Sequence, residues 1–424
     1  MTIRFLLVGV TLIVLLTGRG VLNLTPLEAT AEKHLYSIAQ WEFENLLDKW
    51  LHRIYISMPG RSLSEEEKID IVLEYFRLGE IENELEHAIK NSLDSSGGVG
   101  DDSTYALKND IMQVTKARNR MRDSVEEVIE GEIDSIVYTE DLSRLRLLNA
   151  VGIHFPPVDF RLEESPRVLV VSPRDRIEMI DGVLLDADMN VDDMEVLEER
   201  FLIDQDLSVL VQATGGVSTY PAVVSTDFSL KGMLATAAHE WLHNYLFFHP
   251  LGRGYSKSTE MMSLNETLSN MFGREVGDLA YKKFEVSQSN DNQVESITGS
   301  AVNVNDFDFR LEMHTTRLEV EDMLADGNID GAESYMEERR LFMLDHGYYI
   351  RKLNQAYFAF HGRYTDTPAS ISPIFDQLSA IREISPSLGA FVRNMAEVSD
   401  YDDFLELLEI SRSNSTTRAA FSEQ

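Results

Sequence analysis

The chain has 424 residues, enough for two or three domains, and its apolar content of 43% predicts a folded globular protein. It carries 72 acidic and 38 basic residues, a formal net charge of −34, which disfavours nucleic acid and anionic membrane surfaces as partners. The sequence contains no cysteine, so it has no disulfide and no thiolate metal site. Any metal must therefore be held by histidine or carboxylate side chains.

The chain begins with an apolar segment. Arg4 precedes the apolar run 5–16, whose length suits the core of a signal peptide and is short for a helix that spans a bilayer. The small residues Gly18 and Gly20 offer a cleavage point, whereas Ala-Thr-Ala at 29–31 fits the cleavage pattern better but lies far downstream. We predict that residues 1–24 are a signal peptide or an N-terminal membrane anchor. The remainder is then extracytoplasmic, either membrane-anchored or secreted.

Residues 25–148 are predicted to be mainly helical. Amphipathic patterns cover 63–90 and 106–136, and a segment rich in glycine, serine and aspartate (95–102) forms a surface loop between them. Trp41 and Trp50 have spacings typical of a helix core, which we favour over a position on the membrane surface.

The pattern changes after residue 149, and the region 149–280 combines strands with helices. Proline and glycine separate four short apolar stretches that predict strands: 167–171, 177–185, 207–211 and 217–225. A helix then carries residues 239–243, with Asp227 or Ser229 as its N-cap, and it ends before Pro250 and Gly252.

The last region, 281–424, is predicted to be a helical C-terminal subdomain, with helices over 311–325, 330–340 and 348–361. The fold class expected for the whole chain is α+β, a small sheet with one helix packed on it and mostly helical parts on either side. A cleft is expected between the mixed region and the C-terminal helices. The sequence shows no internal repeat and no nucleotide-binding glycine loop.

Residues 237–245, Ala-Ala-His-Glu-Trp-Leu-His-Asn-Tyr, contain the pattern H-E-x-x-H. Four residues of α-helix turn about 400°, so His239 and His243 project from one face and can share a metal ion. Glu240, next to the first histidine, would be the general base. A catalytic zinc takes three protein ligands and keeps a fourth position for water, so one further donor is required.

Glu266 is the third donor that we favour. It lies in residues 263–273, Ser-Leu-Asn-Glu-Thr-Leu-Ser-Asn-Met-Phe-Gly. Ser263 and Glu266 have the spacing of a capping box, which predicts the start of a helix there. This second helix would bring the carboxylate to the metal.

The two motifs together resemble those of the gluzincin metallopeptidases, and of the thermolysin-like branch in particular, whose third-ligand helix has the form N-E-A-I-S-D-I-F-G. Residues 265–273 follow this form closely. The resemblance covers these two helices only, and it implies a zincin-like metallopeptidase core in the region 149–280. By the same resemblance His239, His243 and Glu266 are the zinc ligands, and Glu240 activates the zinc-bound water.

One position inside the motif departs from the family. Asn270 stands where the family has an aspartate that orients a ligand histidine, and its amide oxygen can still accept the imidazole N–H, with less charge. We expect Asn270 and Asn265 to support the ligands from behind. The thermolysin-like segment that supplies a substrate-binding histidine has no counterpart here. Residues 353–357 have a fainter likeness to bacterial proteins described as predicted aminopeptidases.

His249 is an alternative third ligand, because its spacing from His243 resembles that of the metzincins. Those enzymes use a glycine three residues after the second histidine to turn the chain back, and this chain has Leu246 there. If the helix continues, His249 lies about 240° round from His243, away from the metal. We expect His249 to cap or pack near the helix end, and Glu260 to lie on the surface.

These features predict hydrolysis of a peptide bond in a peptide or protein substrate, with Zn²⁺ as the cofactor. Glu240 would take a proton from the zinc-bound water and deliver it to the leaving amine. The carbonyl oxygen needs a further donor. Five residues of the C-terminal region are candidates: His314, His346, Tyr348, Tyr349 and Tyr357.

The stretch 217–225 offers a way to bind the substrate. It could pair with an extended peptide by strand addition, and Gly215 and Gly216 before it would permit close backbone approach. The alternative from another class is a membrane-tethered binding or scaffold protein that keeps a degenerate protease core. The intact Glu240 and the three available ligands argue against it, because such a protein needs no general base.

Overall fold

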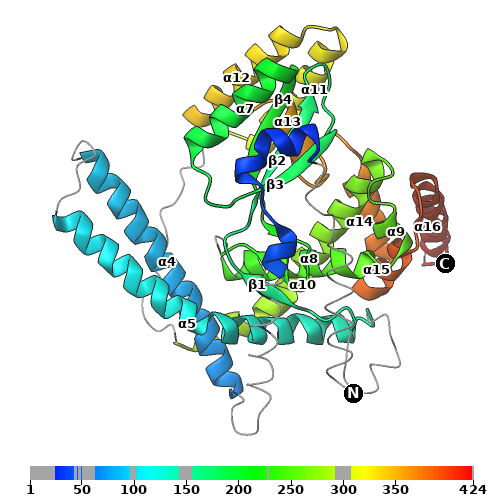
Figure 1. Ribbon diagram of the computed structural model, residues 1–424. Helices are drawn as coiled ribbons and strands as arrows, with labels where there is room; N and C mark the ends of the chain where they lie inside the picture. Colours follow the sequence, from blue (N-terminus) through cyan, green and yellow to red (C-terminus); the bar gives the residue numbers. More distant parts are fainter. Residues whose placement is uncertain are drawn as a thin grey trace.

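A computed structural model of the protein describes residues 24–42, 45, 49, 63–95, 102–142, 155–226, 229–291 and 307–422. Over these residues the chain is mainly helical with two small sheets, and the predicted α+β class is confirmed at this coarse level (Figure 1). The apolar run 5–16, Trp50 and most of the loop 95–102 lie outside the described residues. Among the described helices, none is long and apolar enough to cross a membrane.

Two long helices, α4 (Glu65–Ser95) and α5 (Asp102–Thr139), form a hairpin that projects from the body of the molecule (Figure 1). They extend the predicted amphipathic stretches by a few residues. Ser64 starts α4 with a capping box, because its hydroxyl accepts from the Glu67 backbone N–H and its own N–H donates to the Glu67 carboxylate. Tyr75 and Ile129 anchor one end of the hairpin in the main hydrophobic core.

A three-stranded antiparallel sheet has the order β3-β2-β4, and these strands fall in three of the four predicted stretches. Their bounds are β2 Arg167–Pro173, β3 Asp181–Leu185 and β4 Leu207–Ala213. Alternate residues of β2 point to opposite faces. Leu169 and Val171 pack with α2 (Pro26–Ala31) and α7 (Val191–Gln205), whereas Val168 and Val170 pack with α13 (Gln355–His361).

The second sheet has the order β1-β6-β5, with β1 (Phe160–Leu162) parallel to β6 (Ala222–Val224) and β5 (Gly216–Val217) antiparallel to it. The single strand predicted over 217–225 is therefore wrong. The chain reverses between β5 and β6 in a turn that includes Pro221, whose nitrogen has no hydrogen to donate to a sheet. In the order β1-β6-β5, β5 lies at the end of the sheet and pairs with β6 on one side, so it is an edge strand.

Two helices cross at the centre of the molecule, α8 (Leu230–Leu246) and α10 (Thr259–Asp291). Ser229 caps α8 as predicted, by accepting from the Gly232 backbone N–H at 3.3 Å. The predicted start of the second helix at Ser263 is wrong, because α10 begins one turn earlier, where the Ser258 hydroxyl accepts from the Met261 N–H at 3.2 Å. Ser263 and Glu266 therefore lie inside the helix.

Glycines let the two helices approach closely. A Cβ atom on Gly273 would lie 2.5 Å from the carbonyl oxygen of Ala235, and one on Gly277 would lie 2.9 Å from the backbone nitrogen of Ala235. Both distances are shorter than van der Waals contact, so the α10 backbone rests directly on α8. Residues 263–270, which precede Gly273, are thereby held beside the H-E-x-x-H turn.

The helices of the predicted C-terminal subdomain pack in two different places. The pair α11 and α12 forms its own core with the segment before α13, beside the β3-β2-β4 sheet. Helices α14 to α16 join α8, α10 and α5 in the main core. The bounds are α11 Phe309–Ala325, α12 Ile329–Asp345, α14 Ile374–Ile384, α15 Leu388–Ala396 and α16 Tyr401–Ser422.

Trp41 lies in a helix-core position, as predicted. Its side chain is buried, and its indole N–H donates to Glu163 at 2.7 Å. An indole that is buried with its one donor satisfied belongs to the packed interior.

Candidate metal centre

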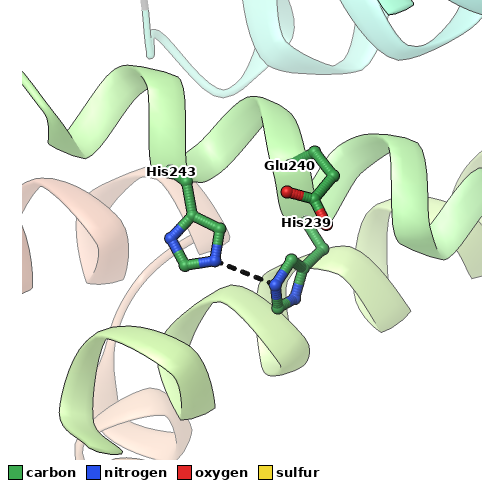
Figure 2. A group of neighbouring side chains, drawn as sticks. All are labelled: His239, Glu240 and His243. Carbon is green, nitrogen blue, oxygen red and sulfur yellow. Dashed lines mark hydrogen bonds between the residues drawn. The ribbon is translucent and has the colours of Figure 1, made fainter. Parts of the chain in front are cut away.

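Helix α8 places His239 and His243 one turn apart on the same face. Their Nε2 atoms face each other at 2.9 Å (Figure 2). Both imidazoles are largely enclosed, with 11% and 15% of the side chains exposed. Two ring nitrogens that meet in this way can share either a proton or a metal ion.

Glu266 on α10 reaches the same point from the other helix. Its Oε2 atom lies 3.7 Å from Nε2 of His239 and 3.5 Å from Nε2 of His243. Zinc bonds of about 2.0–2.1 Å in a tetrahedral site put neighbouring donor atoms about 3.3 Å apart. Two imidazole nitrogens and one carboxylate oxygen at these separations fit a zinc ion with one position left for water.

The electrostatics of the two histidines also favour a cation between them. Burial, helped by the neighbouring His243, lowers the pKa of His239 to about 3, so its ring is neutral at pH 7. Burial also acts to lower the pKa of His243, but the Glu266 carboxylate outweighs burial and leaves it raised. A proton shared at His243 supplies positive charge in the absence of metal, and zinc would displace it.

Glu240 lies beside the two imidazoles on the next residue of α8, and Figure 2 shows the three side chains together. Its side chain is buried, and burial raises its pKa to about 7. A carboxyl group that titrates near neutral pH suits a general base. Gly216 of β5 lies directly against this carboxylate, because an added Cβ would meet Oε1 of Glu240 at 2.6 Å.

Two tyrosines surround Glu266. The Tyr255 hydroxyl donates to Oε1 of Glu266, the oxygen that does not face the histidines. Tyr364 lies on the other side, with its ring centroid 6.4 Å from that of His239, and it also interacts with Glu266 by a hydrogen bond. Burial, together with the negative charge of Glu266, raises the pKa of both phenols, so both remain protonated donors at neutral pH.

Asn270 contacts His239 by a hydrogen bond that favours the protonated ring, as an acceptor does. The Asn270 side-chain nitrogen donates in turn to Oδ1 of Asp366 at 3.1 Å. The Asp366 side chain is 6% exposed and forms a salt bridge with Arg274 at 2.6 Å. The negative charge that Asn270 lacks is therefore supplied by Asp366, which lies behind Asn270 in the chain of hydrogen bonds from His239.

Asn265 lies on the same helix one residue before Glu266 and is almost completely buried. Its side chain lies near His243 and helps to raise the pKa of that imidazole. Each of the two histidines thus has one asparagine behind it.

The structure brings His239, Glu240, His243, Glu266, Asn265 and Asn270 together and leaves His249 outside the group. Helix α8 ends at Leu246, and His249 is the residue before α9 (Pro250–Arg253). Its ring stacks on Tyr245 at 4.5 Å, and Nδ1 lies 3.2 Å from Glu397. It packs near the helix end, as we expected, and does not face the other histidines.

None of the predicted donors to the carbonyl oxygen lines the cleft over the histidines. The reason is that Tyr348 and His346 stack on Phe309 and Phe307, on the outer side of α11 and α12. Tyr349 is 75% exposed to solvent.

His314 lies 3.3 Å from the Ser370 carbonyl oxygen through its Nδ1 atom. Tyr357 stacks against His361, with centroids 4.3 Å apart, and burial raises its pKa to about 12. Glu260 lies in the first turn of α10 and lines a separate cavity.

The cleft over the histidines has a volume of about 790 Å³. Helices α8 and α10 line one side, residues 213–218 with β5 form a second wall, and residues 360–367 after α13 form a third. Four residues that the sequence patterns did not single out line it near the histidines: Tyr255, His361, Arg363 and Tyr364. For the last three, the signal in the sequence is the polar and aromatic run His-Gly-Arg-Tyr at 361–364, which adjoins a predicted helix.

Comparison with known proteins gives no relative. The chain matches no protein-family model, no curated protein and no solved structure.

Proposed function

We propose that the protein is a zinc-dependent peptidase with a zincin-like core, in which His239, His243 and Glu266 hold the metal. The observation that carries the proposal is the convergence of these three donors from two helices, with a buried carboxylate beside them. Structural zinc sites have four protein ligands, whereas a site with three leaves one position for water. The donor set therefore supports a catalytic centre.

Zinc in such a site supplies a water molecule of lowered pKa and polarises the substrate carbonyl. Glu240 would act as the general base for the attacking water, because its carboxyl group titrates near neutral pH. As the water oxygen bonds to the carbonyl carbon and the C–N bond breaks, Glu240 would pass the proton it has taken to the amine that leaves. Asn270 and Asn265 keep the two imidazoles in orientation.

Tyr255 and Tyr364 are the donors that we assign to the developing negative charge on the carbonyl oxygen. Both hydroxyls are hydrogen-bonded to Glu266, so both lie beside the metal position, and each would turn its one O–H from Glu266 to the carbonyl oxygen of a bound substrate. Their raised pKa values keep them protonated, as the role requires. In this role they replace the five candidates that the sequence suggested.

The edge strand β5 supports a peptide as the substrate. Gly216 and Val217 line the cleft, and β6 pairs with one side of β5 only. The open side can pair with an extended chain and hold one of its carbonyls over Glu240. With the N-terminal segment predicted above, we place this activity on the extracytoplasmic side.

The test combines metal analysis with turnover. Wild-type protein loaded with zinc should bind one ion and cleave members of a mixed peptide library. Glu240→Gln should keep the zinc and lose at least about a hundredfold in kcat, since general-base catalysis contributes about 10²–10⁴-fold. Glu266→Ala should lose zinc affinity, while the matched variant Glu260→Ala should keep both zinc and activity.

Three outcomes would contradict the proposal. A wild type that holds no zinc after reconstitution is not a zinc enzyme. A zinc-loaded wild type without turnover on any peptide would favour the binding or scaffold protein. Loss of zinc in His249→Ala, with normal zinc in Glu266→Ala, would replace the ligand set by the metzincin-like one.

A further inference from the structure

The charged residues of the cleft are unusual for so acidic a chain. Among the described residues that line the 790 Å³ cleft, the carboxylates are Glu240 and Glu266, and both have roles at the metal. The cations are Arg274 and Arg363. No carboxylate of the described lining is therefore left to bind a substrate ammonium group, although the sequence has 72 acidic residues.

The two arginines differ in their partners. Arg274 forms a salt bridge with Asp366, at 2.6 Å. Arg363 forms no salt bridge within the described part of the chain, and the hydrogen bonds of its guanidinium are long ones, to the Phe360 carbonyl oxygen at 3.3 Å and the Met262 sulfur at 3.7 Å. A largely enclosed guanidinium with weak partners retains unused donors, and Arg363 is part of the cleft lining.

Aromatic rings hold Arg363 in place. Its guanidinium carbon lies 4.7 Å from the centroid of the Phe360 ring and 5.7 Å from that of Tyr364. Tyr364 is the same ring that lies beside His239. The rings thus hold the Arg363 side chain in place, so a ligand that binds it loses less side-chain conformational entropy. Arg363 is separated from the metal centre by the ring of Tyr364.

Arg363 also marks a junction between two cavities. Together with Met179 it lines both the main cleft and a second cavity of about 360 Å³. Arg363 interacts electrostatically with the Glu266 carboxylate and helps His243 to keep the pKa of that group well below its usual range. Since Glu266 faces the histidines and Tyr255, the remaining donors of Arg363 are available to a ligand.

We propose that Arg363 binds a carboxylate of the substrate, so that the enzyme cleaves peptide bonds close to an anionic group. The inference rests on the proposed peptidase function and names its substrate class. The carboxylate is either the C-terminus of the peptide or an aspartate or glutamate side chain, because a guanidinium binds both in the same bidentate way. Substrate selection by a free amino terminus is the opposite possibility, and Glu178 and Glu260 of the second cavity would then have to bind it.

Four sets of peptides distinguish these sources. One hexapeptide library carries a free C-terminal carboxylate and its partner a C-terminal amide. A third has glutamine and asparagine in place of glutamate and aspartate, and a fourth has an acetylated N-terminus. Zinc-loaded wild type should prefer the carboxylate over its neutral counterpart by about tenfold to a hundredfold in kcat/KM, the range for a charge-assisted hydrogen bond.

The variants connect this preference to one residue. Arg363→Gln should keep its zinc and cleave the charged and neutral libraries equally well, whereas Arg363→Lys should recover part of the preference as a point charge. Arg200→Gln, on the exposed side of α7, changes the net charge equally and should leave the preference intact. Zinc content reports whether each variant is folded at the metal centre.

The results separate the two proposals. Turnover with equal rates on charged and neutral libraries overturns the role of Arg363 and leaves the peptidase intact. Loss of turnover on N-acetylation alone also overturns it, in favour of an aminopeptidase. Absence of zinc or of any turnover in the wild type is instead a failure of the proposed function.

Discussion

Gly216 and Glu240 illustrate how single residues determine this site. Glu240 is buried between α8 and the edge strand, and the backbone of Gly216 approaches its carboxylate so closely that no methyl group fits between them. Glycine is therefore required at 216, because no space is left there for a Cβ atom. The same backbone limits the positions that the Glu240 carboxylate can take, which is how a general base is held in place.

Gly216→Ala tests this close approach. The new Cβ would lie 2.6 Å from Oε1 of Glu240 and 2.8 Å from the Val223 carbonyl oxygen, so the carboxylate or the strand must move. We expect kcat/KM for peptide hydrolysis to fall by about a hundredfold, because small displacements of catalytic groups have effects of this size. Zinc content should stay normal.

The matched control is Gly131→Ala on α5, where an added Cβ meets no atom within 4 Å. That change should leave activity unaltered and stabilise the helix by about 0.5–1 kcal/mol. Unaltered activity in Gly216→Ala would mean that Glu240 is not confined by β5.

The hydrogen bonds from His239 through Asn270 to Asp366 give a second prediction. Asp366→Asn removes the charge that supports the imidazole through Asn270, and loss of such an outer partner typically costs about 10- to 100-fold in metal affinity. Competition with a chelator of known affinity measures the change.

The double variant Asn270→Asp, Asp366→Asn exchanges the two groups and should regain most of that affinity. Asn270→Asp alone places two carboxylates side by side and should not. If the double variant binds zinc no better than Asp366→Asn, the charge of Asp366 does not act through Asn270.

At the scale of elements, the crossing of α8 and α10 assembles the site. Two of the ligands come from α8 and the third from α10, and the separation of the helices is set where Gly273 and Gly277 meet Ala235. Close contact of two backbones fixes both the distance and the rotation of the helices. Glu266 reaches the histidines because of this contact.

Gly273→Ala should disturb both stability and metal binding. The added Cβ would lie 2.5 Å from the Ala235 carbonyl oxygen and 3.1 Å from Cβ of His239, a case of overpacking that costs about 1–3 kcal/mol. Urea denaturation measures that loss, and a lower zinc affinity shows that the helices have moved apart. Gly79→Ala is the control, since its Cβ would meet only the flexible end of Arg118.

The sequence patterns predicted the elements with strong local signals. The amphipathic periodicity of α4 and α5, the strands β2 to β4 and the Ser229 cap are confirmed within a few residues. Helix α7 was missed, because Val196 and Ile203 are exposed on its outer face and blur the pattern formed by its buried residues. The prediction of one strand over 217–225 fails at the turn between β5 and β6. The apolar pattern of the sequence continues through this turn and does not show that the chain reverses there.

The same distinction applies to the candidate site. The turn 239–243 and the motif 265–273 are local patterns, and the structure brings them together. Tyr255, Arg363 and Tyr364 reach the site only through the packing of α13 against the sheet and the path of the chain after it. Long-range packing of this kind produces no periodic pattern in the sequence. The sequence therefore suggests residues such as Tyr348 as donors to the carbonyl oxygen and not Tyr255 or Tyr364.

For the molecule as a whole, the ionisation of Glu240 links catalysis to stability. Its pKa is near 4.5 in the unfolded chain and about 7 in the folded, metal-free protein. The folded state binds this proton more tightly, so the contribution of Glu240 to stability is present below pH 4.5 and is lost as the pH rises through 7. The fold holds a buried carboxylate that it would be more stable without.

Glu240→Gln should therefore stabilise the metal-free protein at pH 8. The neutral amide avoids burying a charge, and a shift of this size corresponds to about 3 kcal/mol. Chemical denaturation in the presence of a chelator should show the difference at pH 8 and none at pH 4. A difference that is the same at both pH values would show that Glu240 is not a titrating group with a raised pKa.

The cleft lies between two separately packed bodies. The main core joins α5, α8, α10 and α14 to α16, whereas the β3-β2-β4 sheet packs with α7 on one face and α13 on the other (Figure 1). A change in the angle between these bodies would alter the width of the cleft and leave both interiors intact. We expect a bound peptide that touches both walls to hold them at one separation, which solution X-ray scattering would record as a smaller radius of gyration if the walls draw together.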